Sequence, residues 1–293
     1  MKRIILFLSF LLIACSGEQT SSESGTTASP QTTSVLTTRY FQYLSEPSIL
    51  IFSATQDWRH EEGIAGANLT IMKLANEMGY SYFTSEDPSV FNDTDLARFK
   101  IIVFNNMTGD TLNKVQEAAF EKWQSAGNGT VLIHGAGDSS HMDWDHYHNG
   151  LIGATFVSHP MAPQFQEARL EVLAPSHPVM KNVPPSFFVT DEWYTFDAPP
   201  TGNAVVLAGL DESTYSPVNT VYGDRSDLRM GPKPADHPII WARCMGPEKA
   251  RTVFTAIGHR YQVYDSPDVA QVLNNTLYWV AKETDPQSGE CNP

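Results

Sequence analysis

Short apolar runs and amphipathic segments alternate along the chain between residues 48 and 134. The apolar runs have the length of buried strands, and they lie at 48–53, 80–84, 100–105 and 129–134. Two segments between them, 61–79 and 111–126, carry apolar residues at helical spacing, and a glycine closes each of them. This order of strands and helices predicts a parallel sheet with helices packed against it.

Strand signals continue through the second half of the chain. Further strands are predicted at 168–173, 204–208, 238–242 and 251–257, and an amphipathic helix is predicted at 267–282. Two stretches without either pattern, 138–165 and 212–236, are long enough to indicate functional loops. The predicted fold class is therefore α/β, with a mostly parallel sheet flanked by helices.

Residues 1–15 have the layout of a bacterial secretory signal. Two basic residues precede an apolar run at 4–13, which is too short to span a bilayer as a finished helix. Cys15 follows directly, and this ending resembles the bacterial lipoprotein box, in which the cysteine is lipidated and becomes the mature N-terminus. A signal peptide cut nearby and an uncleaved anchor are the alternatives. We expect an exported protein held at a membrane by lipid on Cys15. Ser16 favours the outer membrane, facing the periplasm or the cell surface.

The chain after Cys15 divides by composition into three parts. Residues 16–46 are rich in Ser, Thr, Gly and Gln and are predicted to form a flexible tether, because such a segment buries too little apolar surface to fold. Residues 47–283 are predicted to form one α/β domain, since their number suffices for one large core. Residues 284–293 remain as a C-terminal tail.

Charge and cysteine content narrow the partners and the chemistry. The net charge of −14 argues against nucleic acid, because phosphate binding needs a basic surface. The three cysteines have neither zinc-binding nor redox spacing. Cys15 is assigned to the lipid. Cys244 and Cys291 could form a disulfide, but we favour two unpaired thiols, since Cys244 lies in an apolar run and Cys291 in the tail.

Three histidines follow predicted strands. His60 comes after the first strand, His134 ends the strand at 129–134, and His259 follows the strand at 251–257. Ligands of open α/β sheets bind at the carboxyl ends of the strands, so these side chains are expected to meet a ligand at one edge of the sheet. The alternative for each of them is a structural role in packing.

A second group of polar residues occupies the predicted loop after residue 138. Its members are His141, Asp143, Asp145, His146 and His148. Imidazole and carboxylate groups bind metals, so the group is either a metal site or an ordinary polar loop. Its spacing matches no strong metal motif.

A third group combines carboxylates with aromatic residues. It is the run Asp191, Glu192, Trp193 and Tyr194. Carboxylates accept hydrogen bonds from hydroxyls and aromatic rings cover a sugar face, so the run suits a small sugar-like ligand; a turn with buried aromatics is the alternative. The chain also contains three His-Pro pairs, and such pairs can simply mark the entry into a strand. We assign only His159 to a site.

Eight ordered pieces of the sequence resemble the trehalose-utilisation (ThuA-like) family. They are 58–60 (WRH), 103–110 (VFNNMTGD), 133–138 (IHGAGD), 153–156 (GATF) with His159-Pro160, 176–178 (SHP), 191–194 (DEWY), 236–241 (DHPIIW) and 255–259 (TAIGH). The resemblance covers residues 48–282. It implies the flavodoxin-like α/β fold of the class I glutamine amidotransferase superfamily.

The amidotransferase fold provides a test of one activity. Those enzymes place a nucleophilic cysteine on a tight turn after the strand equivalent to 129–134. Here the turn reads His134-Gly135-Ala136-Gly137, without Cys or Ser at its tip. His259 falls near the position of their catalytic histidine but has no thiol to activate. The sequence therefore argues against a Cys-dependent amidotransferase.

The resemblance also implies a class of activity. Members of the family accompany systems that oxidise disaccharides or glycosides at C3 and then process the keto-sugar. A C3 carbonyl acidifies the hydrogen at C2, so a base can remove it while an acid or metal stabilises the enolate. We expect a hydrolase, lyase or isomerase of 3-keto-glycosides or disaccharides. A non-catalytic carbohydrate-binding lipoprotein and a metal-dependent hydrolase of another small substrate are the alternatives.

Under this hypothesis the residues take separate roles. His134 or Glu192 is the base, His259 or His60 is an acid or metal ligand, and Asp138 orients a histidine. The residues expected to contact the ligand are His60, His159, Asp191, Trp193, Tyr194, Asn106 and Trp58. No cofactor is assigned, although a divalent ion such as zinc could be bound by His60, His134 and His259.

Overall fold

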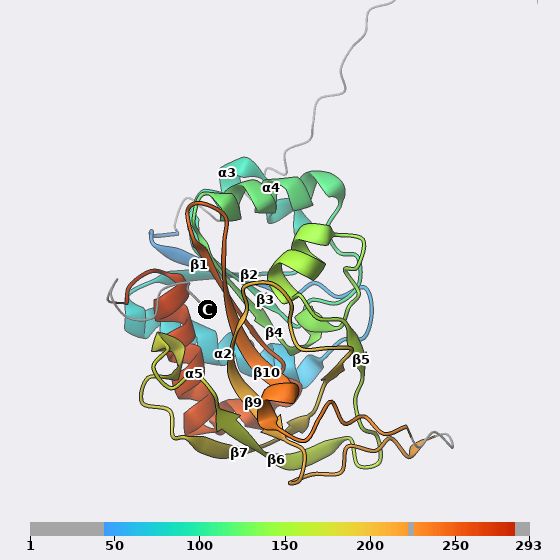
Figure 1. Ribbon diagram of the computed structural model, residues 1–293. Coiled ribbons are helices and arrows are strands. Elements are labelled where there is room, and N and C mark those ends of the chain that lie inside the picture. Colours follow the sequence, from blue (N-terminus) through green and yellow to red (C-terminus); the bar gives the residue numbers. More distant parts are fainter. Residues whose placement is uncertain (1–43, 222–225, 285–293) are drawn as a thin grey trace, which may run out of the picture. The chain divides into compact units, whose positions relative to one another are not determined.

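A nine-stranded sheet organises the protein, whose computed structural model describes residues 44–221 and 226–284 (Figure 1). The strand order is β2-β1-β3-β4-β11-β10-β9-β6-β7. The expected signal peptide with Cys15, nearly all of the expected tether and nearly all of the C-terminal tail lie outside the described residues. The predicted α/β fold class is confirmed.

Five strands at one end of the sheet are parallel. They are β2 (Ser81–Ser85), β1 (Ser48–Phe52), β3 (Phe99–Asn105), β4 (Gly129–Ile133) and β11 (Ala250–Thr255). Every residue of β1, β4 and β11 is buried, as expected where helices cover both faces of a parallel sheet. The apolar runs of the sequence therefore form the parallel part of the sheet.

The other end of the sheet is antiparallel. It contains β10 (Pro238–Met245), β9 (Val205–Asp211), β6 (Phe165–Val172) and β7 (Ser186–Glu192). The strand direction reverses at each of the four pairings from β11 to β7, so β7 runs in the same direction as β11. Its carboxyl end therefore lies at the same edge as those of the parallel strands. The sequence does not predict β7, nor the small sheet of β5 (Phe156–Ser158) and β8 (Thr195–Phe196).

Helices cover both faces of the sheet. Helix α2 (Glu61–Met78) ends at Gly79, α4 (Lys114–Ser125) begins with a capping box at Asn113, and α5 (Pro267–Val280) is capped by Ser266. Adjacent residues of β3 point to opposite faces of the sheet. Asn105 donates a hydrogen bond to the backbone of α2, whereas the ring of Phe104 packs against α4. Figure 1 shows α2 beside α5, and α4 beside the short helix α3 (Asp93–Leu96).

Single helical turns complete the described elements. They are η1 (Pro88–Val90), η2 (His134–Gly137), the π-helix η3 (His146–Ile152), η4 (Pro178–Met180), η6 (Pro234–Asp236) and η7 (Tyr261–Asp265). Two of them, η3 and η6, lie within the stretches that the sequence marks as long loops. Because η2 begins at the residue after β4, the chain turns sharply there, and this turn carries His134.

The cysteine in β10 differs from the expectation. Cys244 is disulfide-bonded, so the prediction of an unpaired thiol is wrong at this position. Cys244 is buried, but it is the penultimate residue of β10 and lies next to an exposed turn at 246–249. Burial in an apolar strand therefore does not prevent the sulfur from pairing. The other two cysteines, Cys15 and Cys291, lie outside the described residues.

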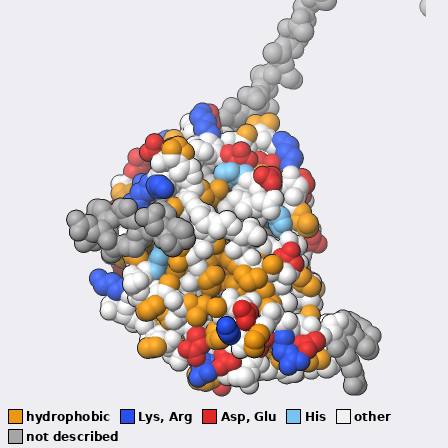
Figure 2. Space-filling model, in the orientation of Figure 1, with side chains coloured by type: hydrophobic (Ala, Val, Ile, Leu, Met, Phe, Trp, Pro, Cys, Tyr) orange, Lys and Arg blue, Asp and Glu red, His pale blue; other side chains and the backbone are white. Residues whose placement is uncertain are grey.

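The molecular surface carries charges of both signs. On the face that Figure 2 shows, acidic and basic side chains are interspersed around a central area where hydrophobic side chains gather. Single large apolar side chains are also exposed, among them Trp58 and Phe188. Within residues 44–221 and 226–284, no helix has both the length and the apolar character that crossing a membrane requires.

Candidate active site

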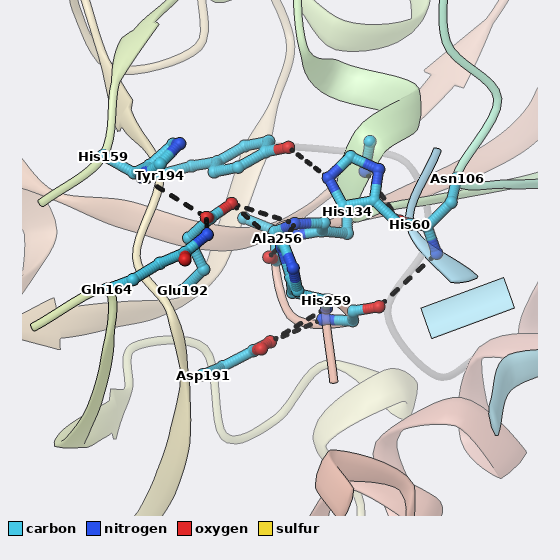
Figure 3. A network of polar contacts seen from close by, with 12 residues as sticks. His60, Asn106, His134, His159, Gln164, Asp191, Glu192, Tyr194, Ala256 and His259 are labelled. Atoms are coloured by element: carbon cyan, nitrogen blue, oxygen red, sulfur yellow. Dashed lines mark hydrogen bonds and ion pairs between the residues drawn. The ribbon is translucent and has the colours of Figure 1, made fainter. Parts of the chain in front are cut away.

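Four polar side chains from distant parts of the chain meet at one edge of the sheet. His60 precedes α2, His134 follows β4, Glu192 ends β7 and His259 follows β11. Each offers one ligand atom, and these atoms all lie within 4.8 Å of one another. We call these four residues the His–Glu cluster (Figure 3). It forms because β1, β4, β7 and β11 all run in one direction and end at the same edge.

His134 occupies the tight turn between β4 and η2. Its φ of 46° is left-handed, which is uncommon for a residue other than glycine. The next residue is glycine because a Cβ on Gly135 would lie 2.9 Å from Nδ1 of His60. His134 is completely buried, and its Nδ1 lies 2.6 Å from the carbonyl oxygen of Ala256. A carbonyl only accepts, so Nδ1 carries a proton, and Nε2 presents a lone pair whenever the ring is neutral.

Three atoms of the His–Glu cluster form a nearly equilateral triangle. Nε2 of His134 lies 3.3 Å from Nδ1 of His259 and 3.4 Å from Oε2 of Glu192. The third side, from Nδ1 of His259 to Oε2 of Glu192, measures 3.1 Å. Since the carboxylate oxygen accepts, Nδ1 of His259 donates to Glu192.

His60 lies next to both other imidazoles. Its ring centroid is 4.8 Å from that of His134 and 4.7 Å from that of His259. Nε2 of His60 lies 3.5 Å from the hydroxyl of Tyr194, whereas the buried Nδ1 has no hydrogen-bond partner among the described residues. Burial, aided by the neighbouring imidazoles, lowers the pKa of His60 to about 2, so this ring is neutral.

Glu192 is an ionised carboxylate in a buried place. Its Oε1 accepts a hydrogen bond from Gln164 at 2.5 Å and lies 3.3 Å from Nδ1 of His159. Burial acts to raise the pKa of Glu192, but its contacts with His134 and His259 outweigh burial and hold that pKa well below its usual range. For His134 the signs are reversed: burial acts to lower the pKa, and the hydrogen bond to Glu192 raises it overall. Glu192 therefore stabilises positive charge on His134.

Asp191 and Asn106 hold the backbone that carries the cluster. The carboxylate of Asp191 accepts hydrogen bonds from the three successive amides of residues 258–260, at 2.7, 3.3 and 3.3 Å. Oδ1 of Asn106 accepts from the amide of Gly135 at 3.1 Å, and its Nδ2 donates to the carbonyl of Gly258 at 3.4 Å. Both side chains are completely buried. They position the site, and their predicted contact with a ligand stays a prediction.

The two aromatic residues after Glu192 point in different directions, and one of them faces the cluster. Trp193 is completely buried, and its Nε1 donates to the carbonyl of Gln166 at 2.8 Å, so its side chain packs in the interior. Tyr194 is buried against the cluster, with its ring centroid 4.2 Å from that of His134. Successive residues of an extended chain point in opposite directions. Glu192 and Tyr194 therefore face the cluster, whereas Asp191 and Trp193 do not.

Asp138 does not orient a histidine through a hydrogen bond in the part of the chain that the structure describes. Its Oδ1 accepts from the amide and the hydroxyl of Ser140, at 2.9 and 2.5 Å. The neighbouring serine thus occupies the acceptor that the sequence-based hypothesis assigns to a histidine. The imidazole of His134 is oriented by the carbonyl of Ala256 instead.

The second predicted group, at residues 141–148, does not converge. Its members have separate partners: Lys114 for Asp143, Asn149 for Asp145, Gln124 for His146 and Thr155 for His148. His141 is buried, and burial lowers its pKa to about 4. The structure therefore does not assemble these five residues into the metal site that the sequence left open.

The cluster meets solvent at His259 and at the neighbouring His159. The side chain of His259 is 14% exposed and that of His159 is 25% exposed, whereas His134 and Glu192 are almost wholly buried. The partly exposed ring of Phe165 lies 5.0 Å from that of His259. Neither Phe165 nor Gln164 is singled out by the sequence, because no motif or periodicity marks them. A ligand at this site would contact the exposed sides of these rings.

Two other features bear on where a ligand binds. Trp58, two residues before His60, is 71% exposed, and its carbonyl accepts a hydrogen bond from Thr108 at 2.9 Å. A hollow of about 710 Å³ lies between η4 and α5 and includes no residue of the His–Glu cluster. Because catalysis requires polar groups that converge on a ligand, we place the candidate active site at the cluster and not at this hollow.

The fold and the cluster together define an α/β protein with a histidine–carboxylate site at the carboxyl ends of its strands. The chain belongs to the ThuA family, described as trehalose utilisation, whose model matches residues 48–280. It is similar to the structure of a ThuA-like protein from Bacteroides uniformis, with 24% identity, a TM-score of 0.65, and 86% of this chain and 96% of that chain covered. A ThuA-like protein from Parabacteroides merdae is 14% identical, with a TM-score of 0.61 and coverage of 85% and 96%. The comparison with curated proteins gives no match.

Proposed function

We propose that the protein processes carbohydrates and that its His–Glu cluster removes the proton at C2 of glycosides or disaccharides that carry a ketone at C3. The observation that carries the proposal is the convergence of three imidazoles and one carboxylate at one edge of the sheet, where His259 and the neighbouring His159 are partly exposed. Imidazoles are the commonest general bases in enzymes. The family description, trehalose utilisation, supports a carbohydrate as the ligand.

Within the cluster, His259 is best placed to act as the base. Its Nδ1–H donates to Glu192, which leaves Nε2 as the acceptor for a substrate proton. The two bases predicted from the sequence are less suitable. Glu192 has a lowered pKa because two imidazoles stabilise its charge, and His134 is completely buried. The geometry therefore favours a His259–Glu192 pair in which the carboxylate orients the base.

Removal of the C2 proton leaves its electron pair in an enolate of the C3 carbonyl. When this pair forms a C1=C2 bond, the C1–O bond breaks, the leaving alkoxide takes a proton, and the C3 carbonyl is retained. Addition of water to that product completes a net hydrolysis. Reprotonation at C3, with transfer of the C2 hydroxyl proton to the C3 oxygen, instead gives the 2-keto isomer. Hydrolase, lyase and isomerase outcomes thus share one first step, and a measurement of that step tests all of them.

The first step is tested by proton exchange in D2O. Methyl 3-keto-glucoside is incubated with the protein, and the C2 hydrogen is followed by NMR. We expect exchange well above that in buffer, a loss of about 100-fold or more in His259→Ala, and no exchange of methyl glucoside, which has no carbonyl. His146→Ala, outside the cluster, should exchange like the wild type. Binding of the keto-sugar without any exchange would instead favour the non-catalytic carbohydrate-binding alternative.

We also propose that the protein is exported and lipid-anchored at Cys15. The layout of residues 1–15 supports this proposal. The disulfide of Cys244 supports an oxidising compartment as well, since such bonds are rare in the cytosol. Labelling with a radioactive fatty acid in a bacterial host tests the anchor. Cys15→Ser should lose the label and leave the membrane fraction, and an unlabelled wild-type protein would contradict lipidation.

A further inference from the structure

We propose that His60, His134, Glu192 and His259 bind one divalent transition-metal ion, for which Zn²⁺ is the best match. The inference rests on the proposed function for the chemical role of the ion, but ion binding itself is tested without a sugar. Neutral imidazoles and a carboxylate are common zinc ligands. All four ligand atoms lie within 4.8 Å of one another.

The spacing of three ligand atoms matches a tetrahedral ion. Zinc binds imidazole nitrogen at about 2.0–2.1 Å and carboxylate oxygen at a similar distance, so two ligands at the tetrahedral angle are about 3.3–3.4 Å apart. The triangle of Nε2 of His134, Nδ1 of His259 and Oε2 of Glu192 has sides of 3.3, 3.4 and 3.1 Å. An ion just outside the plane of the triangle would therefore reach all three atoms with little movement of the side chains.

With neutral rings, the three atoms of this triangle have too few protons to make every contact a hydrogen bond. Nε2 of His134 has a lone pair, because its Nδ1 proton is donated to the carbonyl of Ala256. Oε2 of Glu192 accepts as well, so Nδ1 of His259 supplies the only proton for three close contacts when the rings are neutral. Added positive charge would relieve the repulsion between these two acceptors. A metal ion that replaces the proton on Nδ1 of His259 supplies that charge and contacts every corner.

The surroundings of the cluster resemble the outer shell of a metal site. Metal-bound histidines commonly donate their other ring proton to a carbonyl, as His134 does, and ligand carboxylates are commonly hydrogen-bonded, as Glu192 is by Gln164. His60 adds a buried Nδ1 with no hydrogen-bond partner among the described residues. Buried polar atoms are rarely left without a partner. A bound ion explains why the imidazole of His60 is kept beside two others.

A second group of potential metal ligands differs from the His–Glu cluster because a lysine already neutralises it. Asp110, Glu117 and Asp143 are also close enough to share an ion. However, Nζ of Lys114 already lies 3.1 Å from Glu117 and 3.0 Å from Asp143. The positive charge that a metal ion would supply is thus provided there by a side chain. This group carries no inference, but it offers a matched control variant, Asp143→Asn.

The ion would give the proposed reaction a Lewis acid. A divalent ion polarises a carbonyl oxygen and stabilises the enolate that forms when the neighbouring proton leaves, and it lowers the pKa of bound water. With its Nδ1 bound to the ion, His259 would carry its proton on Nε2 and no longer serve as the base. Water activated by the ion would then supply the base, whereas His259 would be the base only in the ion-free protein.

The test is metal binding by the full-length protein purified without a histidine tag. Metal is removed with a chelator, Zn²⁺ is returned, and the bound ion is measured by elemental analysis and by competition with a coloured chelator. We expect one equivalent of Zn²⁺, and with Co²⁺ the intense visible absorption of a tetrahedral complex. His134→Ala and Glu192→Gln should each weaken Zn²⁺ binding by more than about 100-fold, since even outer-shell partners contribute about 10–100-fold. Asp143→Asn and His177→Ala should bind as the wild type does.

The outcomes separate the ion from the proposed function. Wild-type protein that binds less than a tenth of an equivalent of Zn²⁺ and shows no Co²⁺ absorption would overturn the inference, and this measurement does not depend on the folding of any variant. Unchanged binding by His134→Ala and Glu192→Gln, with their folding checked by circular dichroism, would overturn it too. Full C2 exchange after metal removal would overturn the role of the ion and leave the His259–Glu192 base. An ion that binds without any C2 exchange would support the metal site and contradict the proposed function.

Discussion

Oδ2 of Asp191 accepts a hydrogen bond from the amide of Gly258 at 2.7 Å, which ties the end of β7 to the loop after β11. Glu192 and His259, the next residue along each segment, both belong to the His–Glu cluster. The buried carboxylate of Asp191 thus fixes the distance between them from outside the cluster. A carboxylate suits this position because it offers acceptors to three successive amides and needs no donor.

We expect Asp191→Asn to misplace His259. The asparagine has nearly the same size but turns an NH2 group towards backbone amides that need an acceptor. The variant should be less stable by about 2 kcal/mol, because hydrogen bonds to a charged acceptor each contribute about 1.5–3 kcal/mol. It should also lose C2 exchange activity by about tenfold or more, which urea unfolding and NMR in D2O would measure.

A second aspartate separates positioning from general destabilisation. Oδ1 of Asp197 accepts hydrogen bonds from the amides of Thr155 and Ala198, both at 2.9 Å, on an exposed turn away from the cluster. Asp197→Asn should lose some stability and keep full exchange activity. Equal losses of activity in the two variants would show that Asp191 acts only through stability.

The exposed indole of Trp58 is expected to contribute to ligand binding. Its side chain is 71% exposed and stands two residues before His60, so we expect a sugar bound at the cluster to cover it. Trp58→Ala should weaken binding of the 3-keto-glycoside by about tenfold, which corresponds to about 1.4 kcal/mol. Because an exposed side chain contributes little packing, the unfolding free energy should be nearly unchanged. Calorimetric titration and urea unfolding would measure the two effects.

Phe188 provides the matched aromatic control for Trp58. It is 56% exposed on β7, four residues before Glu192. Phe188→Ala removes exposed aromatic surface of similar kind and should leave sugar binding unchanged. A loss of affinity in both variants, or in neither, would remove Trp58 from the binding site.

Much of the fold follows from sequence periodicity. The buried runs that become β1, β3 and β4 are long, apolar and closed by turns, and all three long helices start and end within a few residues of their predicted bounds. Strand β7 is different, because its outward residues include the exposed Phe188 and its inward residues include Asp191. A strand that alternates in this irregular way has no clear period-two signal.

The sequence predicts only those residues of the candidate site that follow strands of predicted direction. His60, His134 and His259 follow strands of known direction, so one topological rule brings them together. Glu192 depends on β7, whose direction is set by four antiparallel pairings that the sequence does not reveal. For the same reason the run 191–194 could be identified, but which of its side chains face the cluster could not. Gln164 belongs to a loop, where no period exists to mark it.

Stability should fall in mild acid because of buried neutral histidines. Burial, aided by the charge of Arg251, lowers the pKa of His177 to about 4, against about 6.5 when the chain is unfolded. Below pH 6.5 the unfolded chain therefore binds the proton more strongly, so the stability is complete at neutral pH and is lost as the pH falls towards 4. Between pH 7 and pH 5 this one group should remove about 2 kcal/mol.

His177→Asn isolates that contribution. Nδ1 of His177 accepts a hydrogen bond from the amide of Val179 at the start of η4, and asparagine can cap the turn in the same way without titrating. In urea unfolding, the variant should lose about 2 kcal/mol less than the wild type between pH 7 and pH 5. Equal losses in the two proteins would mean that His177 does not titrate with a lowered pKa.

The partner of Cys244 in its disulfide can be identified chemically. Lipid on Cys15 would leave Cys291 as the only partner, so a non-reduced peptide map should contain one cross-linked peptide that joins residues 244 and 291. Cys244→Ser and Cys291→Ser should each lower the unfolding free energy by about 2–4 kcal/mol, because the cross-link closes a long loop in the unfolded chain. The double variant should be no less stable than either single one, since both remove the same bond. If Cys291→Ser has no effect while Cys244→Ser destabilises the protein, Cys15 is the partner, and the proposed lipid anchor is wrong.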